Sequence, residues 1–307
     1  MTTQTPAIAL EHASRWYGNV VAVNDISFAL GPGVTGLLGP NGAGKSTLLN
    51  LMAGLLEPSA GRVLVAGRRP RSSTELYRLI GLVPEREAVH PYLTGHEFAV
   101  LNARLQRLPD PVAAADRAIA TVDLRDAADR AIGTYSKGMR QRAKIAGALV
   151  HDPPILLLDE PFNGMDPRQR LHMMDLLRSM AAAGRTILFS SHILEEVERL
   201  ADAILVIYAG RLAAAGDFRS IRRLMIDRPH TFTVRSSDDR RLASALVAET
   251  AVFGVDLADG LVSIKTSDFG AFSRALPTLA RAHGIRLFEV APTDDSLESV
   301  FSYLVRR

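Results

Sequence analysis

The sequence predicts an α/β fold in which helices cover both faces of a parallel β-sheet, joined to a smaller α+β unit. Short apolar runs at 33–39, 155–160 and 186–191 alternate with longer stretches of helical periodicity. Such runs are typical of strands that are buried on both faces of a parallel sheet. A glycine-rich loop follows the first run, and the pattern changes near residue 220. We therefore expect one large unit followed by a small one.

Length and composition limit the class of protein. At 307 residues and 33.3 kDa, the chain can bury one large core and a smaller second one. The formal net charge of +3 gives no indication of a nucleic-acid partner, and none is expected. The chain contains no cysteine, which excludes disulfides and thiolate zinc sites.

The sequence also predicts where the protein is found. No stretch reaches the roughly 18 uninterrupted apolar residues that a membrane-spanning helix needs. The N-terminal stretch lacks the basic and apolar regions of a signal peptide. We expect a cytoplasmic protein that is peripheral if it works at a membrane, where another polypeptide would supply the spans.

The N-terminal part is expected to begin with antiparallel strands. Residues 7–30 alternate crudely in polarity around a Gly18-Asn19 turn, and 62–67 reads as a further strand. A helix is predicted from Ser46 to Leu56. Its apolar stripe comprises Leu48, Leu49, Met52, Leu55 and Leu56.

A helical subdomain is predicted at about 94–150. Thr94 and Glu97 fit a capping box, and Asp110-Pro111 fits an N-cap followed by a first-turn proline. Beyond this subdomain, helices are expected near 167–183 and 193–200, and a last apolar strand at 203–210 completes the first domain, residues 1–220.

The second domain is predicted to span residues 221–307, after a basic boundary segment that carries Pro229. Its expected elements, in chain order, are strand 231–236, helix 239–249, strands 251–257 and 261–266, helix 269–283, strand 285–290 and helix 294–305. The first six elements follow the β-α-β-β-α-β order of ferredoxin-like modules.

The motif GPNGAGKST lies after a predicted strand and at the start of a predicted helix. It matches the G-x-x-x-x-G-K-[ST] phosphate loop of P-loop nucleoside triphosphatases. Glycines let backbone N–H groups turn onto a phosphate chain, the lysine reaches the β- and γ-phosphates, and the serine hydroxyl suits Mg²⁺. A glycine turn with a surface lysine is the simpler alternative, but the context favours a nucleoside triphosphate. The predicted binding residues are Gly39, Pro40, Asn41, Gly42, Ala43, Gly44, Lys45, Ser46 and Thr47, with Ser46 also a metal ligand.

Two carboxylates, Asp159 and Glu160, end a strand that is predicted to be buried on both faces. Ligands of parallel sheets bind at this end of the strands. Asp159 suits the coordination sphere of Mg²⁺, and Glu160 is placed to orient or deprotonate an attacking water. Two acids at a strand end can also serve only as helix caps.

These segments, in this order, resemble the nucleotide-binding subunit of ABC transporters over roughly residues 5–220. The stretch YSKGM at 135–139 is similar to the family signature Leu-Ser-Gly-Gly-Gln. In that family two subunits pair head to tail, and the signature helix of one caps the γ-phosphate of ATP bound to the other. The resemblance therefore implies ATP and Mg²⁺ as cofactors and a second nucleotide-binding subunit, identical or paralogous. It assigns Ser136, Lys137 and Gly138 to the partner's nucleotide.

The resemblance implies roles for further residues. Tyr17 falls where the family has an aromatic ring that stacks on adenine, although a packing role for this ring at an edge strand is the alternative. Asp166 occupies the D-loop position at the dimer seam, and His192 the position of the switch histidine, which we expect to be catalytic together with Glu160.

Three departures from the family pattern concern Lys137, Met139 and Glu85. The first replaces a glycine of the signature, and the second replaces its glutamine. Glu85 stands where the family has a glutamine that binds Mg²⁺ and relays nucleotide state to the membrane subunit. Since carboxylate oxygen also suits a hard cation, we expect Glu85 to be a metal ligand.

The resemblance implies an ATPase that drives solute movement through an integral membrane permease, and similarity to the ABC-2 group favours export. One alternative is an importer ATPase whose C-terminal domain senses a ligand. Another is a soluble ABC ATPase that acts on ribosomes or DNA, although such proteins usually join two nucleotide-binding units in one chain. A P-loop kinase or GTPase would have no reason to carry residues 135–142 or His192.

Overall fold

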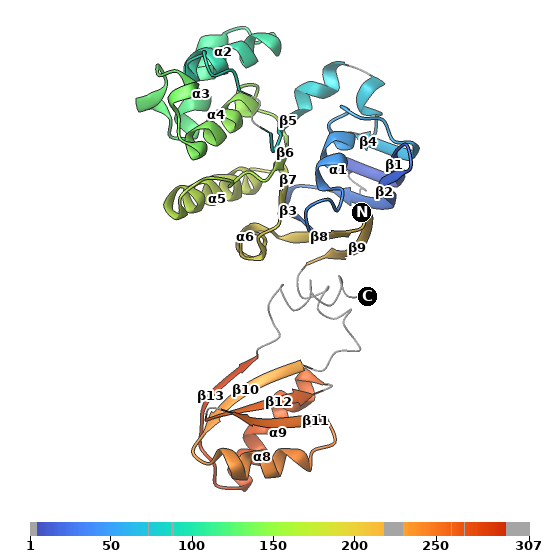
Figure 1. The fold of residues 1–307 in the computed structure, drawn as a ribbon, viewed down its shortest axis with the longest axis vertical. Coiled ribbons are helices and arrows are strands. Elements are labelled where there is room, and N and C mark those ends of the chain that lie inside the picture. Colours follow the sequence, from blue (N-terminus) through green and yellow to red (C-terminus); the bar gives the residue numbers. More distant parts are fainter. Residues whose placement is uncertain are drawn as a thin grey trace. The chain divides into compact units, whose positions relative to one another are not determined.

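The computed structural model describes residues 5–72, 74–86, 89–217, 230–258, 260–266 and 268–292. Contacts between Cα atoms divide the chain into two compact units, residues 1–217 and 218–307. Each unit is described by itself below (Figure 1). The helix predicted at 294–305 lies outside the described residues.

A three-stranded antiparallel sheet opens the first unit. Its order is β2-β1-β4. Its strands are β1 (Ile8–Tyr17), β2 (Val20–Leu30) and β4 (Ala60–Val65). The strand-turn-strand predicted at 7–30 is confirmed by the β1–β2 pairing, in which Tyr17 lies opposite Val20.

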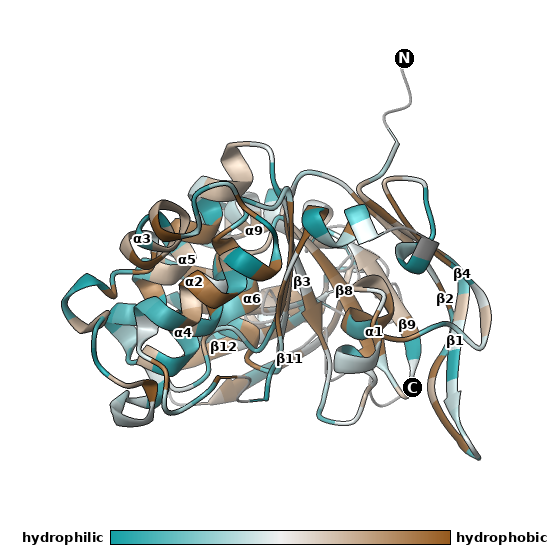
Figure 2. Ribbon diagram, turned by 90° about the horizontal axis from the view of Figure 1, so that it is seen from above, coloured by the Kyte–Doolittle hydropathy of each residue, from teal (hydrophilic) through white to brown (hydrophobic). Residues whose placement is uncertain are grey.

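The central element of the first unit is a six-stranded sheet of order β5-β6-β7-β3-β8-β9. Its strands are β3 (Gly33–Leu38), β5 (Ile80–Val83), β6 (Ile155–Asp159), β7 (Thr186–Ser191), β8 (Ala203–Tyr208) and β9 (Arg211–Gly216). The first five strands in chain order are parallel, and the hydrophobic character of β3 and β8 is visible in Figure 2. The predicted parallel sheet is confirmed by these five strands, and the edge strand β9, which the sequence did not predict, is antiparallel to β8.

Helix α1 (Lys45–Met52) lies between the two sheets. Its leucines share a buried cluster with Ile8 of β1 and Leu157 of β6. The prediction that this helix reaches Leu56 is wrong. Gly54, with φ 73°, adopts the left-handed conformation that ends helices, and Leu55 is consequently 58% exposed.

A group of helices forms the predicted helical subdomain: α2 (Gly95–Leu105), α3 (Pro111–Thr121) and α4 (Lys137–Leu149) (Figure 1). Thr94 and Glu97 form the predicted capping box, and Asp110 caps α3 ahead of its first-turn proline. Short 3₁₀ turns complete the connections: η1 (Pro70–Ser72), η2 (Thr74–Leu79), η3 (Arg125–Ala127) and η4 (Ile132–Thr134).

Helices α5 (Pro167–Ala182) and α6 (Leu194–Leu200) cover the face of the six-stranded sheet opposite α1 (Figure 1). The approach of α6 is very close at Gly36 in β3. A Cβ added there would lie 2.6 Å from Cγ1 of Val197 on α6. Glycine is therefore required for α6 to pack at this distance.

The second unit is a four-stranded antiparallel sheet of order β11-β12-β10-β13 with two helices on one face. In chain order its elements are β10 (His230–Ser236), α8 (Asp239–Val247), β11 (Val252–Ala258), β12 (Leu261–Thr266), α9 (Phe269–Ala282) and β13 (Leu287–Pro292). This is the β-α-β-β-α-β order of a ferredoxin-like module. Phe232, Leu242, Ile264 and Leu276 belong to its own buried core.

Within the described residues, no helix combines the length and the hydrophobicity that crossing a bilayer requires.

Candidate active site

The phosphate loop joins β3 to α1 and is shaped by two glycines in the left-handed region. Gly42 has φ 79° and Gly44 has φ 105°. At Gly44 a Cβ would also lie 2.3 Å from the carbonyl oxygen of Ala22, so no side chain fits. Backbone N–H groups at the start of a helix favour an anion. Local sequence thus produces the loop-to-helix geometry that a phosphate chain needs.

Lys45, the first residue of α1, is buried beneath this loop with 7% exposure. Its Nζ donates hydrogen bonds to the carbonyl oxygens of Gly39 at 2.7 Å and Pro40 at 3.3 Å. The same nitrogen lies 3.8 Å from Oε1 of Glu160. The tertiary structure therefore joins the predicted phosphate-binding lysine to the predicted water-activating carboxylate.

Ser190 organises the two carboxylates at the end of β6. In the parallel register Asp159 lies opposite Ser190 of β7. The Ser190 hydroxyl donates to Oδ1 of Asp159 at 2.5 Å and accepts from the backbone N–H of Glu160 at 2.9 Å. Sequence analysis did not assign Ser190 a role, because the signal is its position opposite Asp159, which requires the strand register.

The Glu160 carboxylate lies between two basic groups. Its backbone has φ 49°, a conformation that non-glycine residues adopt rarely, and its side chain is buried. Nδ1 of His192 lies 2.9 Å from Oε1 of Glu160, the oxygen that also faces Lys45. Gln141 of α4 adds a hydrogen bond to the Glu160 carbonyl oxygen at 3.4 Å. A carboxylate held in this way is suited to accept a proton from water.

A second buried carboxylate, Glu196 on α6, supports the segment that carries His192. The Ser191 hydroxyl donates to Oε2 of Glu196 at 2.6 Å and accepts from the backbone N–H of Ile193 at 3.0 Å. Arg170 of α5 lies 3.4 Å from Oε1 of Glu196. Burial raises the pKa of Glu196, while the Ser191 hydrogen bond and the Arg170 charge oppose the rise. Sequence analysis missed this residue because one of three nearby glutamates in a helix carries no distinguishing pattern.

The predicted signature residues lie at the start of α4, whose neighbours are α2 and α3. Ser136 is the N-cap and accepts a hydrogen bond from the N–H of Met139 at 3.2 Å. Lys137 packs its aliphatic stem on Gly164, where an added Cβ would lie 2.5 Å from Cγ and Cδ of Lys137. Gly138 faces the same segment, since its Cβ would meet the Gly164 carbonyl oxygen at 3.0 Å. The substituted lysine is thus accommodated by a glycine.

Three other predicted residues are placed individually. Asp166 is the N-cap of α5, where Oδ1 accepts from the N–H of Gln169 at 2.9 Å. The Tyr17 ring is 43% exposed and lies 4.9 Å from the guanidinium carbon of Arg15. Glu85 is exposed after β5, and its carbonyl oxygen accepts from Nζ of Lys144 at 3.2 Å.

The donor set can be compared with the needs of Mg²⁺. Among the described residues, no cluster of three or more His, Cys, Asp or Glu side chains forms a protein cage for a metal. Mg²⁺ in nucleotide sites is usually held by one or two protein oxygens together with phosphates and waters. The exposed Ser46 hydroxyl at the loop and the Asp159 carboxylate oriented by Ser190 fit that chemistry.

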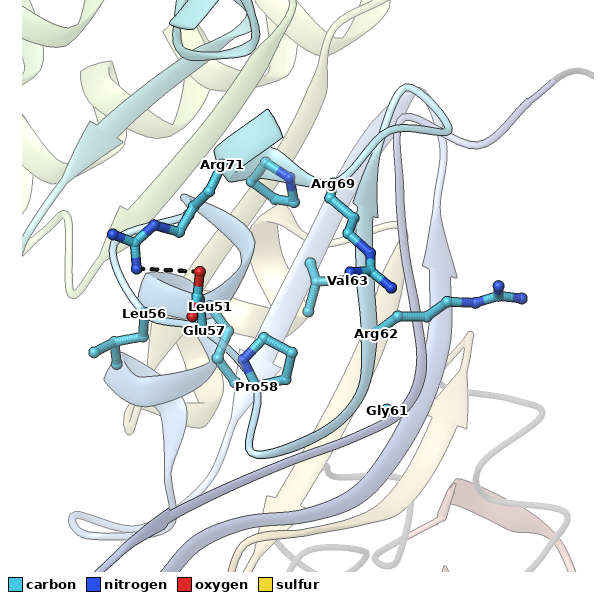
Figure 3. A pocket seen from close by; sticks show the side chains of 11 residues that line it. Leu51, Leu56, Glu57, Pro58, Gly61, Arg62, Val63, Arg69 and Arg71 are labelled. Carbon is cyan, nitrogen blue, oxygen red and sulfur yellow. Dashed lines mark ion pairs between the residues drawn. The ribbon is translucent and has the colours of Figure 1, made fainter. Parts of the chain in front are cut away.

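A cavity of about 410 Å³ lies elsewhere, beside the C-terminal end of α1 and the strand β4 (Figure 3). Arg62, Arg69 and Arg71 line it together with apolar side chains. Nη1 of Arg71 lies 3.5 Å from Oε1 of Glu57. This cavity contains none of the phosphate-loop or carboxylate residues, so we do not place the reaction there.

The fold and the loop define a P-loop nucleoside triphosphatase, and comparison with known proteins narrows the class. The ABC transporter family model matches residues 23–163. Daunorubicin resistance ATP-binding protein DrrA3 of Streptomyces coeruleorubidus is 35% identical over 97% of this chain and 95% of its own. Linearmycin resistance ATP-binding protein LnrL of Bacillus subtilis is 32% identical over 97% of each chain.

A further relative and a solved structure also point to the ABC transporter family. Nod factor export ATP-binding protein I of Rhizobium leguminosarum is 39% identical over 68% of this chain and 69% of its own. The solved structure of an ABC transporter ATP-binding subunit superposes with a TM-score of 0.66 and 30% identity, over 71% of this chain and 93% of that one. The chain therefore belongs to the ABC transporter ATP-binding proteins, and it is an ATPase subunit of a transporter.

Proposed function

We propose that this chain hydrolyses ATP to power export of a solute through a separate permease, from the cytoplasmic face of the membrane. Two relatives that match nearly the whole chain are named for resistance to daunorubicin and linearmycin, and a third is named for Nod factor export. Export is favoured over import for that reason. Since the permease contacts the solute, the identity of the solute is not encoded in this chain.

The observation that carries the proposed chemistry is the Glu160 carboxylate, which faces both Lys45 and His192. With ATP at the phosphate loop, Lys45 would bind the β- and γ-phosphates, and Glu160 would accept a proton from the attacking water. His192 would hold that water and the γ-phosphate in position. Ser46 and Asp159, with Glu85 as a third candidate, would hold Mg²⁺, which supplies charge neutralisation on the phosphates. Tyr17 would stack on adenine.

The catalytic assignment is tested by Glu160→Gln, which keeps size and hydrogen bonding but removes the base. We expect nucleotide binding to persist and ATP turnover to fall by about 10²–10⁴-fold, the usual contribution of a general base. Glu195→Gln, an exposed neighbour of the site on α6, is the control and should hydrolyse ATP at the parent rate. Parent-rate turnover by Glu160→Gln would refute the assignment.

We propose further that the active form is a head-to-tail pair in which the α4 start of one subunit, Ser136 to Gly138, and its Asp166 complete the partner's site. This is supported by the position of Ser136, which begins a helix packed with α2 and α3, whereas Lys45 begins a helix between the two sheets. The partner would be an identical subunit or a paralogue.

Mixing two defective variants tests this arrangement in a homodimer. Ser136→Glu would repel the partner's γ-phosphate, and Glu160→Gln removes the base. In a head-to-tail pair one composite site of the mixed dimer carries both defects and the other carries none. We expect about a quarter of parent ATPase activity on mixing, from closed two-fold pairing. Mixtures that remain as inactive as each variant alone would contradict the pairing.

Transport direction can be measured in inside-out vesicles that contain this chain and the membrane protein encoded beside its gene. ATP-dependent accumulation of solute inside such vesicles indicates export. ATP-dependent release of preloaded solute would instead support the importer alternative.

A further inference from the structure

Lys144 of α4 is a buried cation that donates to three acceptors in one turn. The residue is 6% exposed. Its Nζ donates to the carbonyl oxygens of Pro84 at 2.7 Å, Glu85 at 3.2 Å and Arg86 at 3.2 Å. An ammonium group has three N–H donors, so this turn can accept from every one of them.

The hydrogen bonds of Lys144 are expected to stabilise the fold at this turn. A buried charge is costly unless it is paired or hydrogen-bonded, and bonds to a charged group are stronger than neutral ones. Three consecutive carbonyl oxygens that converge on one nitrogen also fix the backbone of the turn. Lys144 therefore stabilises one particular conformation of residues 84–86.

The contact connects two parts of the first unit. The 84–86 turn follows β5, which pairs with β6, the strand that ends at Asp159. Lys144 belongs to α4, whose N-cap is Ser136. The two residues are eight positions apart, or about 12 Å along a helix. The ammonium thus joins the turn that carries Glu85 to the helix that carries the signature.

We propose that Lys144 is a positioning residue that holds Glu85 in place and makes the 84–86 turn move together with α4. This inference rests on the proposed function, in which Glu85 contacts Mg²⁺ and Ser136 contacts the partner's nucleotide. Lys144 itself touches neither nucleotide nor metal in this account. Its effect reaches them through the turn.

The same helix offers a matched control. Arg142 is also a largely buried cation of α4 that donates to backbone carbonyl oxygens, those of Val122 at 3.3 Å and Asp123. Its acceptors, however, lie just after α3, inside the helical subdomain. Arg142→Met removes a comparable tether without touching the 84–86 turn.

The first readout is tryptic cleavage after the exposed Arg86, followed by mass spectrometry on the full chain without nucleotide. Cleavage of a transiently opened segment follows the population of the open form. We expect Lys144→Met to be cut there roughly 10-fold faster or more, given the strength of bonds to charged groups. Arg142→Met should be cut after Arg86 at the parent rate.

The second readout separates positioning from chemistry. For Lys144→Met we expect the Mg²⁺ concentration at half-maximal ATPase activity to rise several-fold, with a smaller change in kcat, and Lys144→Arg to restore part of the Mg²⁺ response. If Lys144→Met does not fold, Lys144→Gln is measured in the same way. Folded variants with parent cleavage after Arg86 and a parent Mg²⁺ response would overturn the inference. Failure of the proposed function would differ, since Glu160→Gln would then leave turnover unchanged.

Discussion

Ser190 shows how a single buried hydroxyl can hold two functional groups. It donates to Asp159 and accepts from the backbone N–H of Glu160, and it is completely buried. Without this hydroxyl, both groups lose a partner in a place that water does not easily reach. The geometry of both carboxylates thus depends on a residue that carries no charge.

We predict that Ser190→Ala lowers the free energy of unfolding by about 1–3 kcal/mol, the cost of leaving buried polar groups unpaired. ATP turnover should fall roughly 10-fold or more, since each 1.4 kcal/mol of lost positioning corresponds to a factor of ten. Ser190→Thr retains the hydroxyl and should recover most of the lost stability and most of the lost ATP turnover. Ser179→Ala, a change of an exposed serine on α5, is the control. An unchanged turnover for Ser190→Ala would contradict this role.

His151 makes the stability of the first unit depend on pH. Its Nε2 lies 3.2 Å from the Ile80 carbonyl oxygen. Burial lowers the pKa of His151 from its ordinary value of 6.5, and the hydrogen bond to Ile80 and the nearby Asp152 charge oppose this. Below pH 6.5 the unfolded chain therefore takes up a proton that the folded chain resists, so stability falls as the pH decreases.

The expected outcome is that the parent protein loses more stability between pH 7.5 and pH 5.5 than His151→Gln does. Urea unfolding can be followed through Trp16, the single tryptophan of the chain. His172→Gln, on the exposed face of α5, should retain the full pH dependence. If both variants behave like the parent, His151 does not titrate in this way.

At the scale of elements, α6 is held against β3 by the absence of a side chain at Gly36. The Cβ of any other residue at this position would collide with Val197 of α6. In the sheet, Gly36 lies opposite Ile204 of the neighbouring strand β8. Since α6 begins two residues after His192, its distance from the sheet also affects the position of His192, the proposed switch histidine. Packing and chemistry are connected through this one helix.

We expect Gly36→Ala to destabilise the first unit by about 1–3 kcal/mol, the usual cost of overpacking a core, and to reduce ATP turnover. The double variant Gly36→Ala/Val197→Ala removes the colliding Cγ1 atom and should recover part of the loss. Gly31→Ala, where an added Cβ meets no atom within 4 Å, should be neutral. Equal stability of Gly36→Ala and Gly31→Ala in urea would disprove the packing argument.

At the scale of the whole molecule, each unit has a hydrophobic core of its own among the residues that the structure describes. One joins α1 to both sheets of the first unit, and the other fills the second unit around Phe232. Domains with their own cores usually unfold as separate cooperative units. The role of the second unit in transport is therefore open to study by changes that leave the first unit folded.

Calorimetry should accordingly show two unfolding transitions. Phe232→Ala, which creates a cavity, should lower the free energy of unfolding of the second unit by about 3–5 kcal/mol. It should therefore shift only the transition of that unit to lower temperature. Leu157→Ala, in the core of the first unit, should shift only the transition of the first unit to lower temperature. A single transition that both substitutions shift equally would show that the two units unfold together.

Several features were predictable because they depend on residues close together in the chain. The phosphate loop, the capping box at Thr94 and most strands follow from short motifs and periodicity. The extent of α1 was predicted wrongly, because Gly54 ends the helix while the apolar stripe continues. Strand β9 was not predicted, since RLAAAG has little β-propensity and becomes a strand through pairing with β8.

The sequence by itself determined the fold class, the nucleotide loop and the presence of two acids after a buried strand, because local hydrogen bonding and side-chain periodicity decide these. Only the tertiary structure decided that Glu160 faces both Lys45 and His192. It also decided that Ser190 forms a hydrogen bond to Asp159, and that Lys144 donates hydrogen bonds to the turn that contains Glu85. Those contacts join residues that are 30 or more positions apart in the chain. Strand order and helix packing, which local propensity does not specify, bring them together.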